Sequence, residues 1–253
     1  MPFTFAHPAI VLPLRRSKWF SFTALVFGSM APDFEYFFRM QPFSAYSHTM
    51  WGLLWFDVPL VLLLALLYHG IVKRPLIACL PTWVGRGLSA TYSMDWNWRT
   101  WRSIFVYGYS GLIGSFSHVL WDAFTHQGAY FVERIWFLQL PITLGGVVIP
   151  VFKLLQHGST SLGFLAIGYV LWKEGRALPI SAWKPLVNTK TKWLFWIGVA
   201  LIGIFGAALY SAIAKGTLLL TQPLIHVVPF LSGSLAGLVI MSWWLHTTKI
   251  PPK

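Results

Sequence analysis

The 253-residue sequence contains a single cysteine, Cys79, and only seven acidic residues. One cysteine excludes an intramolecular disulfide and a thiolate metal cluster, so any metal site must use nitrogen and oxygen ligands. Charged residues make up 10% of the chain and hydrophobic residues 56%, a composition that does not suit an ordinary soluble globule. The net charge of +12 comes from short basic clusters between apolar runs, which favours a membrane protein over a nucleic-acid-binding protein.

Long apolar runs divide the chain. Four of them have the length of a membrane span, namely 50–72, 103–121, 193–214 and 224–246. A further run, 19–38, is interrupted near Pro32, a residue better suited to beginning a helix than to continuing one. This run therefore either crosses the membrane or folds back as two short helices. The run 159–172 is short for a span, and 130–155 is expected to lie partly at the membrane interface.

These runs predict an all-α fold, a polytopic membrane helical bundle with five to six spans. We expect a metal-site helical domain at 1–175, a cytoplasmic loop at 176–192 and a C-terminal transmembrane hairpin at 193–253. If 19–38 crosses, fifteen of the 19 basic residues fall on one side and four on the other. The basic side is expected to face the cytoplasm. If 19–38 folds back, the bias weakens to twelve against seven.

Three metal-capable side chains, His118, Asp122 and His126, stand four residues apart. On a helix each step advances about 6 Å and rotates about 40°, so the three would lie along one face. His118 and His126 would then be about 12 Å apart, too far to bind one ion together. We expect them to serve different ions bridged by Asp122, an arrangement that suits two-metal hydrolysis. Imidazole and carboxylate ligands favour zinc, with manganese or iron as alternatives.

Other polar residues fall near the same extracytoplasmic end of the predicted spans. His48 precedes the span 50–72, and His157 precedes the run 159–172. His7 and Asp33 join them only if 19–38 folds back, and we prefer that arrangement for the site. Glu35 lies two residues after Asp33 and hence on a different helical face, so Asp33 is the preferred ligand. Asp57, inside a predicted span, is a candidate supporting residue, because a carboxylate there usually faces a partner or an aqueous cavity.

Several motifs resemble an uncharacterised family of prokaryotic membrane proteins known as domain of unknown function 4184. They are Met1–Ala9, Gly28–Tyr36, Ser47–Thr49, Gly114–His126 and Leu155–Gly163, and the resemblance covers about residues 1–165. That family resembles membrane-bound metal-dependent hydrolases and, more remotely, zinc-dependent phospholipase C and P1 nuclease. The latter are all-helical enzymes that cut phosphodiesters with clustered zinc ions.

The resemblance implies a set of metal ligands, with Asp122 bridging two or more zinc ions: His7, Asp33, His48, His118, Asp122, His126 and His157. Asp33 and Asp122 are also expected to act in catalysis, while Glu35, Asp57 and Gln156 would support the ligands from outside. The soluble enzymes have a late glutamate ligand, whereas Ser161 stands four residues after His157 here. This departure favours a two-metal site.

The leading hypothesis is therefore a membrane-embedded hydrolase of phosphate esters or phospholipid headgroups that uses a metal-activated water. The protein is expected in the prokaryotic cytoplasmic membrane, with membrane lipid as its environment and candidate substrate and without a nucleic-acid partner. A metal or proton transporter is the first alternative, because histidine and aspartate also line ion pathways. A structural membrane protein with a non-catalytic metal site is the second.

Overall fold

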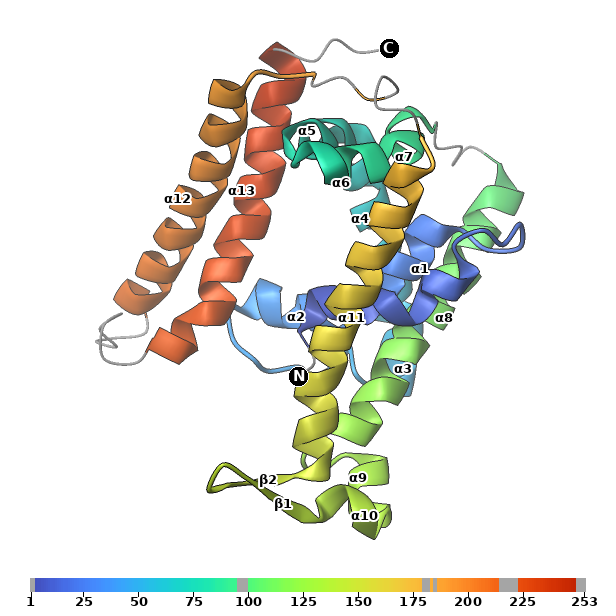
Figure 1. Ribbon diagram of the computed structural model, residues 1–253, viewed down its shortest axis with the longest axis vertical. Helices are drawn as coiled ribbons and strands as arrows, with labels where there is room; N and C mark the ends of the chain where they lie inside the picture. The colour runs from blue at the N-terminus through green and yellow to red at the C-terminus, as the bar shows by residue number, and fades with distance from the viewer. Residues whose placement is uncertain (1–2, 95–99, 179–182, 184–185, 214–222, 249–253) are drawn as a thin grey trace. The chain divides into compact units, whose positions relative to one another are not determined.

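The structure, a computed structural model, describes residues 3–94, 100–178, 183, 186–213 and 223–248, and it is mainly helical (Figure 1). The predicted loop 176–192 lies partly outside the described residues. The elements are η1 (3-10 helix, Thr4–Leu14), α1 (Phe22–Gly28), α2 (Ala31–Arg39), α3 (Met50–Gly52), η2 (π-helix, Leu53–Asp57), α4 (Val58–Leu67), η3 (π-helix, Tyr68–Val72), α5 (Lys73–Cys79), α6 (Thr82–Gly87), α7 (Ser89–Ser93), α8 (Trp101–Thr125), α9 (Tyr130–Arg134), α10 (Trp136–Gln139), β1 (Pro141–Leu144), β2 (Val147–Pro150), α11 (Val151–Arg176), α12 (Thr189–Ile213), η5 (3-10 helix, Pro223–His226) and α13 (Val227–Thr248).

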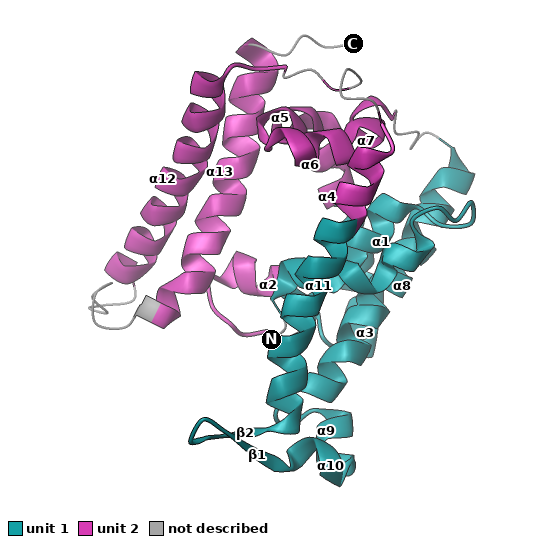
Figure 2. Ribbon diagram, in the orientation of Figure 1, with its two compact units in different colours: residues 1–33, 45–63, 97–169 teal, residues 34–44, 64–96, 170–253 magenta. Residues whose placement is uncertain are grey.

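The chain divides into two compact units, each assembled from separate stretches of sequence (Figure 2). Unit 1 comprises residues 1–33, 45–63 and 97–169. Unit 2 comprises residues 34–44, 64–96 and 170–253. The segment 19–38 contains two short helices, α1 and α2, rather than one continuous helix, as the sequence around Pro32 allowed.

In unit 1, α1 packs against α8 at glycines that let the two backbones approach closely. A Cβ atom on Gly28 would overlap the carbonyl oxygen of Gly111, and one on Gly114 would lie 2.5 Å from the carbonyl oxygen of Leu25. The Ser115 hydroxyl of α8 donates a hydrogen bond to the Gly28 carbonyl (3.2 Å). The C-terminal end of α1 is thereby held directly beside the middle of α8.

Beyond α8, the chain forms the short helices α9 and α10 and a two-stranded antiparallel hairpin, β1–β2. This hairpin is a small departure from the predicted all-α fold. It closes at Gly145 (φ 56°) and Gly146 (φ 83°), and two residues at positive φ suit a tight hairpin turn. A small core that includes Val132, Leu138 and Phe152 holds this region together.

In unit 2, α12 and α13 form a close antiparallel pair. A Cβ atom on Gly206 would lie 3.0 Å from the Cα of Gly233, so the two helices pack nearly backbone to backbone. The end of α5 joins them in a core that includes Cys79, Phe195 and Leu245. Both helices lie within the predicted segment 193–253, apart from the first residues of α12.

Among the described residues, three helices are long and apolar enough to cross a membrane: Met50–Cys79, Thr189–Ile213 and Leu224–Thr248. They cover the predicted spans 50–72 and 224–246 and the described part of the span 193–214. The fourth, 103–121, lies in α8, which is not among the three because its serine, glycine and tyrosine residues dilute the apolar ones. The run 159–172 is part of the longer and more polar α11.

Candidate metal centre

Six of the seven predicted ligands come together in unit 1. The 3-10 helix η1 supplies His7, the first turn of α2 supplies Asp33, and the segment before α3 supplies His48. The helix α8 contributes His118 and Asp122 on one face, and His126 follows directly after its end. The ligands therefore come from four separate parts of the chain.

The first group of ligand atoms, called here the Asp33 side, comprises His48 Nε2, Asp33 Oδ1, His118 Nε2 and Asp122 Oδ2. His118 Nε2 lies 3.5 Å from Asp33 Oδ1 and 3.4 Å from Asp122 Oδ2. His48 Nε2 lies 3.7 Å and 3.8 Å from the same two oxygens. Each of the two nitrogens thus faces both carboxylate oxygens.

The second group, called here the His7 side, surrounds the other oxygen of Asp122. Asp122 Oδ1 lies 3.6 Å from His7 Nε2 and 3.6 Å from His126 Nδ1. The ring of His7 stacks on that of His118, with centroids 3.8 Å apart, so the two groups are in direct contact. Asp122 is the residue that both groups share, through a different oxygen in each.

The distances of 3.4–3.6 Å fit metal ligation better than direct hydrogen bonding, and the two to His48 are slightly longer. Ligands about 2.0–2.2 Å from a tetrahedral zinc ion lie about 3.3–3.6 Å apart, whereas hydrogen bonds to carboxylates are usually below 3.2 Å. Four of the atoms are buried and have no hydrogen-bond partner among the described residues: His7 Nε2, Asp33 Oδ1, His118 Nε2 and Asp122 Oδ1. Because an unpaired buried polar atom is costly, four of them aimed at one another indicate a place for a cation.

Surrounding groups orient the ligand atoms towards the centre. His118 Nδ1 lies 2.8 Å from the Ser29 carbonyl, which only accepts, so Nδ1 carries a proton and Nε2 is the nitrogen that faces the centre. The Thr4 hydroxyl donates to Asp33 Oδ2 (2.6 Å), which turns Oδ1 inward. Ser47 Oγ lies 3.0 Å from His48 Nδ1, so the opposite nitrogen of His48 also faces the centre.

The protonation states of His7, His48, His126 and Asp122 suit ligation as well. Burial, together with His118, lowers the pKa of His7 to about 3, and burial lowers the pKa of His48 and His126. Burial opposes ionisation of Asp122, but His118 outweighs it and lowers the pKa of this carboxyl to about 2. At neutral pH these rings are uncharged and Asp122 is ionised, the forms in which such groups bind metals.

Comparison with known proteins identifies the family of this chain. A family model described as a domain of unknown function (DUF4184) matches residues 1–243. The chain belongs to the DUF4184 family. No curated protein and no solved structure matches the chain.

In this DUF4184 protein the seventh predicted ligand, His157, does not join the other six. His157 is exposed on α11, whereas the preceding residue, Gln156, is 1% exposed. Gln156 Nε2 lies 3.5 Å from His126 Nε2. Neighbouring residues on a helix point about 100° apart, so a helix that turns Gln156 towards the centre turns His157 away from it.

The position of His126 differs from the continuous stripe that the spacing predicted. The helix α8 ends at Thr125, and His126 has extended backbone angles (φ −113°, ψ 141°). Its ring folds back so that Nδ1 lies 3.1 Å from the carbonyl oxygen of Asp122. His126 therefore reaches Asp122 from beyond the helix rather than from the next turn. The carbonyl oxygen only accepts, so Nδ1 carries a proton in this arrangement and has no lone pair for a metal.

Two of the predicted supporting residues, Glu35 and Asp57, lie outside the two ligand groups. Glu35 forms an ion pair with Arg39, one helical turn later (Oε1–Nη2 2.7 Å). Asp57 is fully buried in η2 and is not part of either ligand group. The supporting residues that the DUF4184 structure does show, Thr4, Ser29 and Ser47, carry no signal in the sequence, apart from the nearness of Ser47 to His48.

Proposed function

We propose that this chain is a membrane-embedded, metal-dependent hydrolase of phosphate esters or phospholipid headgroups. The observation that carries the proposal is the position of Asp122, whose two oxygens face two separate sets of histidine nitrogens. Zinc is the preferred metal for these ligands, with manganese or iron as alternatives. Two such ions, when bound, supply an activated water and stabilise the charge that develops on a phosphoryl group.

The chain's own residues would prepare this site. Thr4 and Ser29 hold Asp33 and His118 in ligating orientations. On the Asp33 side, the ligand atoms of Asp33, His48 and His118 all lie within 4.8 Å of one another, so these three residues can hold one ion. The His7 side offers Asp122 and His7, and His126 can join them only when its Nδ1 leaves the Asp122 carbonyl oxygen, 3.1 Å away. A shell with few protein ligands leaves positions open, as is typical of a catalytic ion. Asp33 and Asp122 are the carboxylates we assign to the reaction.

The proposal places the protein in the prokaryotic cytoplasmic membrane. Apolar helices such as Thr189–Ile213 support membrane insertion. Five to six spans would require further segments, α8 among them, to cross as well. The distribution of basic residues favours a site on the extracytoplasmic face, where a lipid headgroup could reach it without leaving the bilayer.

The test combines metal analysis with two assays on purified protein. Zinc-loaded protein is expected to release nitrophenol from bis(p-nitrophenyl) phosphate or a phosphorylated headgroup from phospholipid vesicles. The Asp122→Asn variant should cleave at least about 100-fold more slowly, because it removes the negative charge that both groups share. Protein that binds zinc but cleaves neither substrate would refute the hydrolase. Zinc uptake into proteoliposomes would support the transporter, and bound zinc without either activity the structural alternative.

A further inference from the structure

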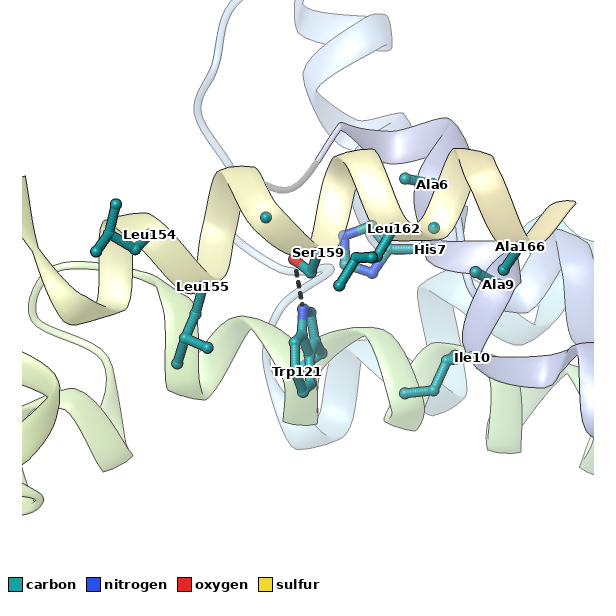
Figure 3. A pocket seen from close by; sticks show the side chains of 12 residues that line it. Ala6, His7, Ala9, Ile10, Trp121, Leu154, Leu155, Ser159, Leu162 and Ala166 are labelled. Carbon is teal, nitrogen blue, oxygen red and sulfur yellow. Dashed lines mark hydrogen bonds between the residues drawn. The ribbon is translucent and has the colours of Figure 1, made fainter. Parts of the chain in front are cut away.

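An apolar groove opens directly beside the His7 side. It lies in unit 1 between η1, α8 and α11 and has a volume of about 420 Å³, within the usual range of small-molecule sites. Its walls are mainly alanine, isoleucine and leucine side chains of η1 and α11, with Trp121 of α8 at its middle (Figure 3). The groove therefore suits a hydrocarbon group.

Apart from His7, the polar side chains that line the groove, Trp121 and Ser159, are already paired. Trp121 Nε1 donates a hydrogen bond to Ser159 Oγ (3.2 Å), which is drawn as a dashed line in Figure 3. Ser159 Oγ in turn donates to the carbonyl oxygen of Gln156 (3.1 Å). Neither side chain needs a polar ligand, so the groove would favour methylene groups over a sugar or a peptide.

Small residues hold η1 and α11 together while leaving the groove open. A Cβ atom on Gly163 would lie 2.9 Å from the carbonyl oxygen of Ala6, so this glycine allows close contact between the two helices. The backbone N–H of Phe3 also donates to Thr160 Oγ1 of α11 (3.1 Å). Gly158, by contrast, has no atom within 4 Å of its Cβ position and leaves space along the groove.

His7 belongs both to the groove and to the candidate metal centre. Its ring forms part of the groove wall, while its Nε2 lies 3.6 Å from Asp122 Oδ1 in the candidate metal centre. A molecule that fits both must be apolar along its length and anionic at the end that meets His7. This combination describes an amphiphile with one hydrocarbon chain and a phosphate-like head.

We infer that the groove binds one hydrocarbon chain of a phosphate-headed lipid and places its head at the His7 side. The position of the lipid head rests on the proposed function, whereas the position of the hydrocarbon chain rests on the groove alone. The substrate class is then a lipid phosphoester rather than a water-soluble one.

The inference is tested by photolabelling zinc-loaded protein in detergent. The probe is a dodecyl phosphonate with a diazirine in its chain, and the matched control is the corresponding dodecyl alcohol. We expect the phosphonate to label residues 154–166 at a concentration at least about tenfold below that of the alcohol. Removal of zinc, or the Asp122→Asn variant, should abolish this difference.

Two variants of α11 form a matched pair. Gly158→Leu fills the groove and should weaken phosphonate labelling about tenfold, the effect of displacing one to two methylene groups. Gly168→Leu makes the same change at another glycine with open space around it, outside the groove, and should label like the wild type. Because Leu162 lines the groove and is 68% exposed, Leu162→Ser tests the same groove with little risk to folding.

The outcomes separate the two proposals. Labelling of 154–166 that is equal for phosphonate and alcohol and independent of zinc would show a groove filled by bulk lipid, and would overturn the inference. Cleavage of bis(p-nitrophenyl) phosphate without labelling of the groove would also overturn it while leaving the hydrolase intact. Zinc-dependent groove labelling without cleavage of any phosphoester would sustain the inference and refute the hydrolase.

Discussion

Asp122 is the residue whose replacement should affect the metal centre most. Its Oδ2 lies 3.4 Å from His118 Nε2 on the Asp33 side, and its Oδ1 lies 3.6 Å from His7 Nε2 on the other. Asp122→Asn removes the negative charge from both groups while keeping the shape of the side chain. Loss of a supporting partner alone weakens metal binding by about 10–100-fold, so loss of the charge on a ligand that both groups share should weaken both sites by at least about 100-fold, or about 2.7 kcal/mol each.

Metal content gives a direct measure. Protein purified in detergent, equilibrated with a slight excess of zinc and desalted, should contain two zinc ions per chain. His126→Ala should retain the ion on the Asp33 side, and His48→Ala the ion on the His7 side, because each of these histidines faces one group only. Asp122→Asn should lose most of both ions under the same conditions.

The control is His157→Ala, which should retain both ions because the structure leaves His157 exposed on α11. Full occupancy in Asp122→Asn would contradict a bridging role for this carboxylate. Loss of one ion in His157→Ala would instead support the ligand set that the family resemblance implied, and would show that α11 turns further than the structure indicates.

Two further predictions concern the surroundings of the centre. Thr4→Val removes the hydroxyl that donates to Asp33 Oδ2 and should lower zinc affinity about 10–100-fold in a competition titration with a chromogenic chelator. The control is Thr143→Val, on the exposed strand β1. Equal zinc affinities of the two variants would rule out the orienting role of Thr4. Gly28→Ala forces a methyl group against the carbonyl of Gly111 in α8 and should destabilise the protein by about 1–3 kcal/mol in thermal unfolding. Gly108→Ala, at a position of α8 with open space around it, should not destabilise the protein. Equal melting temperatures of the two variants would show that α1 and α8 are not closely packed at Gly28.

Local features of this centre could be predicted from the sequence. His118 and Asp122 stand one helical turn apart, and a helix through an apolar run places them on one face regardless of the rest of the fold. The interruption at Pro32 likewise indicates a break between two short helices. Both features depend only on residue spacing and on backbone chemistry, and not on contacts between distant segments.

Other features depend on packing between distant segments. Whether His7 meets Asp122 is decided by how η1 and α1 pack on α8, and this packing depends on glycines whose partners are about 85 residues away. Whether Gln156 or His157 faces the centre depends on the rotation of α11, which a mixed polar and apolar sequence does not specify. The grouping of segments into two units also follows from long-range contacts.

The sources of the six ligands have a consequence for how the protein matures in the cell. All six lie between His7 and His126, so about the first half of the chain contains them all. Chains are made from the N-terminus, and their earlier parts are free to fold first. Zinc could therefore be captured while the ribosome is still adding α11 and the C-terminal pair of helices. The groove, which needs α11, would form only afterwards, around a centre already loaded with metal.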